Sequence, residues 1–188
     1  MTESAIFDRQ QFWQFSFEFY QQDNIEEACL KLQDDFDLNI NVILFLLWYS
    51  THAQKVISTK QVEGLLDAIS VADERVQEFR QFRKTFLAKV SHQEVADMHD
   101  VRQALLDTEL TLESKVQHVI IEYANEHLIL PGNVEPIVEH PIELDFVAHE
   151  NLDIYCRYLH PETCREIFQA QQDLINTLIH FPFKELAA

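Results

Sequence analysis

Helix-breaking residues are almost absent from the first two thirds of this 188-residue chain. Proline does not occur before Pro131, and the only glycine ahead of it is Gly64. Because glycine and proline most often end or interrupt helices, long helices are expected up to about residue 130. Two glycines are also too few to build a glycine-rich phosphate loop or a nucleophile elbow.

Long apolar runs and cysteine pairs are missing as well. The longest apolar run, Val42 to Tyr49, is far short of the roughly 20 residues that a helix needs to cross a bilayer. The first residues lack the basic region and apolar stretch of a secretion signal. The three cysteines are odd in number and form no CxxC pair, which indicates reduced thiols. We therefore expect a cytoplasmic protein that does not interact with membranes.

Positive charge is scarce, with 14 Lys and Arg against 32 Asp and Glu and a net charge of −18. Residues 94–188 carry most of this imbalance. A surface this negative repels phosphate backbones, so no nucleic-acid partner is expected. A basic protein partner would be attracted, although solubility alone also explains such a charge.

Helical periodicity runs through most of the chain. Segment 12–20 is aromatic on a wide arc, and segment 24–36 repeats apolar residues with helical spacing. Asn24 is the expected N-cap of the latter, and Glu27 would complete a capping box. The next helix is expected to start at Asn39. Because it is apolar on every side, other helices must surround it.

Three more helices are expected before residue 130. One follows a cap at Ser58, one runs from about Asp73 to Val90, and a long one spans roughly residues 102–128. The expected inward face of the second consists of Val76, Phe79, Phe82, Phe86 and Val90.

These features predict an all-α fold, an antiparallel multi-helix bundle of about six to eight helices with a carboxyl-terminal helical hairpin. The bundle domain is expected over residues 1–130 and a proline-rich linker over 131–141, which holds three of the five prolines. Residues 142–188 then form the hairpin, which we expect to pack on the bundle.

Several segments together form a recognisable pattern. Trp13 and Tyr20, seven residues apart, are followed by "ACLKLQ" at 28–33, "NINVILFLLW" at 39–48 and "FRQFRK" at 79–84. In this order and spacing they resemble an uncharacterised proteobacterial family of small all-helical proteins, a domain of unknown function. The resemblance implies the fold and no activity.

The resemblance covers about residues 12–125, and two positions depart from the family pattern. Asp37 stands where the family tends to have glycine, so a positive φ is expected there. Asn39 stands where the family has Asp, which keeps the capping role but removes a charge.

Basic residues gather on one expected helix, where Arg80, Arg83 and Lys84 share a stripe. An Arg beside aromatic residues can direct its guanidinium into a cleft, where it suits a carboxylate or phosphate. Pairing with Asp or Glu of neighbouring helices is the alternative.

A pocket is one hypothesis for the space between the first three helices and this arginine helix. Arginines would hold an anionic ligand there, while aromatic and amide side chains would line it. For the aromatic residues, core packing is the alternative. The candidate ligand-binding residues are Arg80, Arg83, Lys84, Gln33, Asn41, His52, Trp13, Tyr20 and Trp48.

The chain shows no motif for metal, cofactor or nucleophilic chemistry. None of the nine histidines has Glu three residues before it, the spacing of helical di-iron sites. His118, Glu122 and Glu126 share a helical face, but a solvated stripe explains them too. Cys29 is expected to be a core residue. We therefore expect no metal, no cofactor and no catalytic residue.

Two functions of different classes follow. The first is a non-enzymatic interaction or regulatory protein that presents an acidic surface to a basic partner. The alternative is a protein or enzyme that binds an anionic small molecule in the pocket described above. The sequence does not set the oligomeric state.

Overall fold

The computed structural model describes residues 7–89, 98–128, 141–162 and 165–181. Within these ranges every regular element is a helix, which confirms the all-α fold. The helices are α1 (Arg9–Tyr20), α2 (Ile25–Phe36), α3 (Ile40–Ala53), α4 (Thr59–Ala88), α5 (His99–His127), α6 (Pro141–Leu159) and α7 (Arg165–His180).

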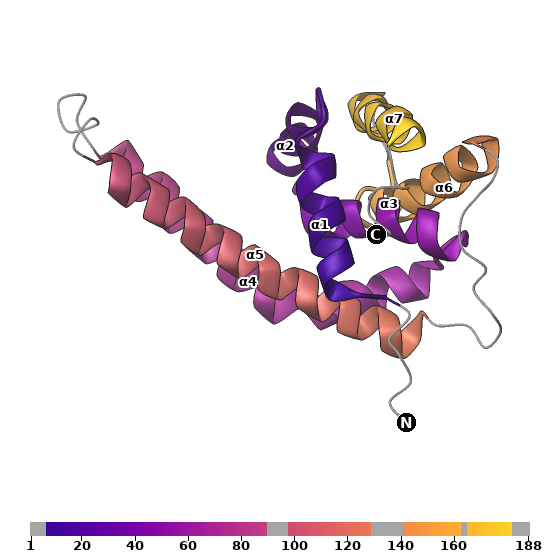
Figure 1. The fold of residues 1–188 in the computed structure, drawn as a ribbon, viewed down its shortest axis with the longest axis horizontal. Helices are drawn as coiled ribbons and strands as arrows, with labels where there is room; N and C mark the ends of the chain where they lie inside the picture. Colours follow the sequence, from indigo (N-terminus) through magenta and orange to yellow (C-terminus); the bar gives the residue numbers. More distant parts are fainter. Residues whose placement is uncertain (1–6, 90–97, 129–140, 163–164, 182–188) are drawn as a thin grey trace.

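The molecule consists of a long arm and a body (Figure 1). The arm is the antiparallel pair α4 and α5, whose 30 and 29 residues make helices about 45 Å long. One end of this pair packs against the body formed by α1, α2, α3, α6 and α7, and the other end projects beyond it. A projecting helical pair leaves an angle between arm and body, and this angle holds the site described below.

Helix α3 is the centre of the body. It contacts α1, α2, α5 and α6, and every residue from Asn41 to Thr51 is buried. The prediction that this apolar helix is surrounded by others is therefore confirmed. No helix in the described ranges is both long and apolar enough to span a membrane.

The helix ends follow local sequence chemistry, with one exception. Asn39 caps α3, because its side-chain oxygen accepts from the backbone N–H groups of residues 41 and 42, and Ser58 caps α4 in a capping box. Asp37 has the expected positive φ of 53°. Asn24 is the N-cap residue of α2 as expected, but it is left-handed and its side chain makes no cap hydrogen bond within the described residues, so the capping box predicted with Glu27 is wrong.

The two helices predicted over residues 59–90 form one continuous helix, α4. Asp73, where a second helix was expected to start, instead accepts a 2.7 Å hydrogen bond from the side chain of Asn39. Phe82 does not face inward, because 53% of its surface is exposed. Nearer the body α4 and α5 lie close together, where a Cβ on Gly64 would clash with the hydroxyl of Tyr123.

The carboxyl-terminal helices extend the core of the body. Helix α6 packs on α3, α7 packs on α2, and a single apolar cluster runs from Phe7 to Phe181. The linker predicted at 131–141 lies outside the described residues except for Pro141. Its use as a domain boundary stays a prediction.

Candidate functional site

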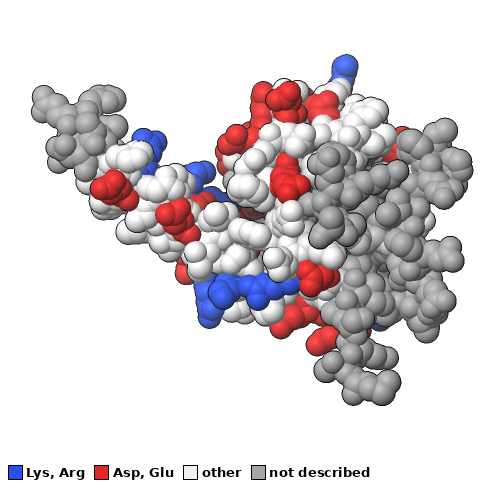
Figure 2. Space-filling model, viewed as in Figure 1, with Lys and Arg blue, Asp and Glu red and all other residues white. Residues whose placement is uncertain are grey.

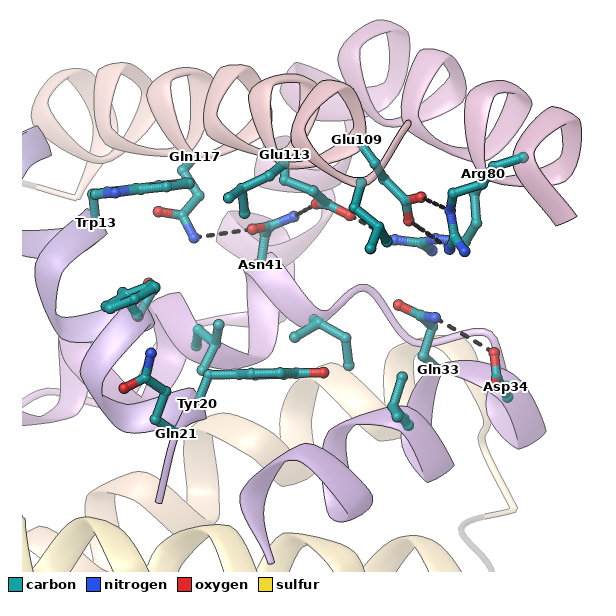
Figure 3. Close-up of a pocket in the computed structure, with 18 of the residues that line it drawn as sticks. Trp13, Tyr20, Gln21, Gln33, Asp34, Asn41, Arg80, Glu109, Glu113 and Gln117 are labelled. Carbon is teal, nitrogen blue, oxygen red and sulfur yellow. Dashed lines mark hydrogen bonds and ion pairs between the residues drawn. The ribbon is translucent and has the colours of Figure 1, made fainter. Parts of the chain in front are cut away.

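A cavity of about 420 Å³ lies in the angle between the arm and the body (Figure 3). Five helices line it: α1, α2 and the start of α3 on the body side, and α4 and α5 on the arm side. We call this cavity the arm pocket.

The body side of the arm pocket is largely apolar. Trp13, Phe17 and Tyr20 of α1 present three aromatic rings to it, because these residues lie three or four apart on one face of the helix. Aliphatic side chains from three other helices, α2, α3 and α5, complete the apolar lining: Leu30, Ile40, Leu44, Leu106 and Leu110. Several of these side chains are 40–54% exposed, so the rim of the pocket is open to solvent.

The arm side carries ion pairs between α4 and α5. Arg80 binds Glu109 through Nε at 3.0 Å and Glu113 through Nη2 at 2.5 Å. Arg83 also donates to Glu109. These side chains are only 12–20% exposed, so the pairs are shielded from much of the solvent.

The two carboxyl groups differ although both bind Arg80. Burial opposes ionisation of Glu109, but hydrogen bonds from Arg83 and Arg80 outweigh it and lower the pKa of that carboxyl. Among the described arginines, Glu113 binds Arg80 alone. Burial therefore raises the pKa of Glu113, and the charge of Arg80 offsets this only in part.

The ion pairs continue into a chain of amides. Asn41 donates from Nδ2 to Glu113 and accepts a 3.0 Å hydrogen bond on Oδ1 from Nε2 of Gln117. The chain ends at Gln117, whose Oε1 is buried and has no hydrogen-bond partner among the described residues. The hydroxyl of Ser16, also buried in the wall of the pocket, is likewise unpaired within the described part of the chain.

Seven of the nine candidate residues are brought together here. Two are not, because they lie elsewhere on α3. Trp48 is 1% exposed in the core, and His52 follows it by one turn with its ring 4.2 Å from the Trp48 ring. Along α3, His52 is about 16 Å from Asn41, which does line the pocket. The seven candidate residues that line the pocket are Trp13, Tyr20, Gln33, Asn41, Arg80, Arg83 and Lys84.

Sequence reasoning missed the polar residues that α5 contributes. Glu109, Glu113 and Gln117 repeat every four residues, the spacing that places side chains on one helical face. This four-residue repeat is the sequence signal by which the three residues could have been found. Ser16 is a lone hydroxyl among aromatic residues, and no such repeat marks it.

The acidic and histidine face expected on α5 is a surface feature. His118 lies 3.2 Å from Glu122, and both side chains are at least 39% exposed. In the part of the chain that the structure describes, no three His, Cys, Asp or Glu side chains are grouped to hold a metal ion.

Comparison with known proteins places the arm pocket within one family. A family model described as "Protein of unknown function (DUF2390)" matches residues 11–120. Every residue that lines the arm pocket falls in this span. No curated protein and no solved structure matches the chain.

Proposed function

We propose that this chain, which belongs to the family of proteins of unknown function DUF2390, binds a small organic molecule in the arm pocket. The observation that carries the proposal is the pair of unpaired buried polar atoms, Ser16 Oγ and Gln117 Oε1, in the wall of one cavity. Leaving such a group unpaired costs about 1–3 kcal/mol, so folded proteins seldom keep two at one place without a partner.

The shape and lining of the pocket support the same proposal. Ligand pockets are typically about 300–1,000 Å³, largely apolar and equipped with a few placed polar groups. The arm pocket, at about 420 Å³, has aromatic rings on one side and amides on the other. Its carboxylates and guanidinium groups bind one another, which favours a binding role over an enzymatic one.

A ligand screen with one matched pair of variants tests the proposal. Purified protein is screened by thermal shift against small aromatic compounds that are neutral, cationic or anionic, and hits are measured by calorimetry. Leu110→Ser removes an apolar contact from the rim, while Leu159→Ser changes a comparably exposed leucine of α6 that does not line the pocket.

We expect Leu110→Ser to weaken binding about tenfold, which corresponds to about 1.4 kcal/mol of lost apolar contact, and Leu159→Ser to bind normally. A screen without hits, or hits that both variants bind equally well, would contradict the proposal. Anionic hits that depend on Arg83 would support the anionic ligand of the alternative hypothesis drawn from the sequence.

A basic protein partner is a second proposal, supported by the net charge of −18. On the face shown in Figure 2, Asp and Glu side chains are spread over both arm and body rather than gathered in one patch. Such a surface attracts through its overall field, which salt screens. Capture of a partner at low salt that disappears at high salt supports this role, and capture that salt does not change counts against it.

A cytoplasmic location is a further proposal. Cys29 and Cys156 are buried free thiols, and reduced cysteines are usual in proteins of the cytosol.

A further inference from the structure

The arm pocket specifies a chemical group as well as a space. Ser16 and Gln117 are 5% and 4% exposed, yet each has one side-chain oxygen that no residue of the described ranges pairs. Both residues line the arm pocket, so a molecule bound there is adjacent to both side chains. What it must offer depends on which polar atom of Gln117 is left over.

The hydrogen-bond chain decides that question. Glu113 is paired with Arg80, and an ionised carboxylate can only accept. Asn41 therefore turns its Nδ2 toward Glu113 and its oxygen toward Gln117. Gln117 in turn uses its Nε2 as the donor to Asn41, so the unpaired atom is the carbonyl oxygen, an acceptor.

The cations of the pocket are already engaged by carboxylates. Arg80 and Arg83 bind Glu109 and Glu113, and Lys84 lies 3.6 Å from Asp34. Three positive and three negative groups therefore line the pocket. An anion would have to compete with these carboxylates for the arginines, whereas an uncharged donor needs no such exchange.

The aromatic side chains of the pocket are placed to pack against a ligand ring that carries such a donor. In Figure 3, Trp13 and Gln117 are at the same end of the pocket, with Tyr20 on the side opposite Gln117 and Arg80 at the far end. Flat rings pack well against aromatic side chains, both stacked and edge to face.

Resting on the proposed function, we infer that the ligand of the arm pocket is an uncharged aromatic molecule whose N–H or O–H group donates to Gln117 Oε1. The ring lies among Trp13, Phe17 and Tyr20, and the hydroxyl of Ser16 makes the second polar contact. The ion pairs of Arg80 and Arg83 with the glutamates stay intact. They shape the pocket and do not bind the ligand.

Matched ring compounds test the inference. Indole carries one N–H donor, benzofuran has nearly the same shape without a donor, and indole-3-acetate adds a negative charge. Binding of each is measured by calorimetry to the wild-type chain, to Gln117→Met, which has a similar size but no carbonyl acceptor, and to Gln117→Glu, which keeps an acceptor. Thermal melting confirms that each variant is folded.

We expect indole to bind wild type about tenfold more tightly than benzofuran, the factor that one hydrogen bond of about 1.4 kcal/mol provides. The ratio falls to about one in Gln117→Met and is kept in Gln117→Glu. Equal binding of indole and benzofuran to wild type overturns the inference, because water then satisfies Gln117. Tighter binding of indole-3-acetate overturns it in favour of an anion.

The outcomes separate the inference from the proposed function. If none of these three ring compounds binds while the broader screen finds ligands sensitive to Leu110→Ser, the inference fails and the proposed function stands. If nothing binds in either experiment, both fail. Should Gln117→Met not fold, the comparison of indole with benzofuran on the wild-type chain still decides.

Discussion

The two tryptophans of this chain lie in opposite environments. Trp48 is 1% exposed and packs against the rings of Phe12 and Phe7, with centroids at 5.3 and 5.9 Å. Trp13 is the sequence neighbour of Phe12, but it is partly exposed and lines the arm pocket. One turn of α1 thus packs into the closed core on one face and lines the open cavity on the other.

Polar groups distinguish the two environments better than the rings do. Near the end of α3 that carries Trp48, the buried hydroxyl of Ser50 accepts from Asn151 and donates to the carbonyl of Leu46. Beside Trp13, the buried hydroxyl of Ser16 has no partner in the part of the chain that the structure describes. Apolar burial occurs in both places, and what marks a site is the buried polar group that the fold leaves unpaired.

The largest expected effect is a difference in stability between the two tryptophans. Trp48→Ala removes a fully packed ring and should lower the free energy of unfolding by about 3–5 kcal/mol. Trp13→Ala removes a ring that one side of the pocket already leaves uncovered and should cost about 1 kcal/mol. Urea denaturation followed by circular dichroism measures both. Equal losses would mean that Trp13 is as much a core residue as Trp48.

The next effect concerns the polar side of the pocket. Arg80→Met leaves Glu113 buried without its cation and should destabilise the fold by about 2 kcal/mol. Arg83→Met should cost less, because Glu109 keeps its bond to Arg80. Adding Glu113→Gln to Arg80→Met removes the stranded charge and should restore part of the stability. If Arg83→Met proves the more harmful variant, the ion pairs do not centre on Arg80.

Much of the fold could be predicted from the sequence because its helices carry local signals. The apolar run from Val42 to Tyr49 required a surrounded helix, and Asp37, Asn39 and Ser58 ended or began helices as expected. The break expected before Asp73 was wrong. The side chain of Asp73 binds Asn39, 34 residues away, and no local pattern reveals such a contact.

The site could be predicted in part for a similar reason. The placing of a pocket between the first helices and the arginine helix used residues whose helical faces are readable from their spacing. The partners of the arginines could not be predicted. Arg80 contacts Glu109 because of the register in which α4 packs against α5, and the sequence does not give that register. Trp48 and His52 were wrongly assigned to the pocket. Their helix is apolar on every side, so its sequence does not indicate which face packs against which neighbouring helix.

A smaller effect compares the two buried serines. Ser50→Ala leaves a donor of Asn151 unpaired and should destabilise by about 1–2 kcal/mol. Ser16→Ala removes an unpaired hydroxyl from a helix and should stabilise by about 0.5 kcal/mol. Differential scanning calorimetry of the ligand-free protein measures both. Destabilisation by Ser16→Ala would show that this hydroxyl already has a partner, such as a water molecule.

The smallest effect is a pH dependence on the core side. Burial lowers the pKa of His52 below 6.5, and the hydrogen bond with the carbonyl of Trp48 only partly opposes this. A lowered pKa means that the unfolded chain takes up the proton first, so this contribution to stability is complete above pH 6.5 and is lost as the pH falls through the folded pKa.

The measurement is the difference in unfolding free energy between wild type and His52→Gln from pH 7.5 to pH 5. The variant cannot titrate at this position, so the other histidines cancel in the difference. We expect the unfolding free energy of wild type to fall relative to that of the variant as the pH falls. A constant difference would show that His52 is hydrated enough to charge freely, and the ring beside Trp48 would then belong to an open environment like that of Trp13.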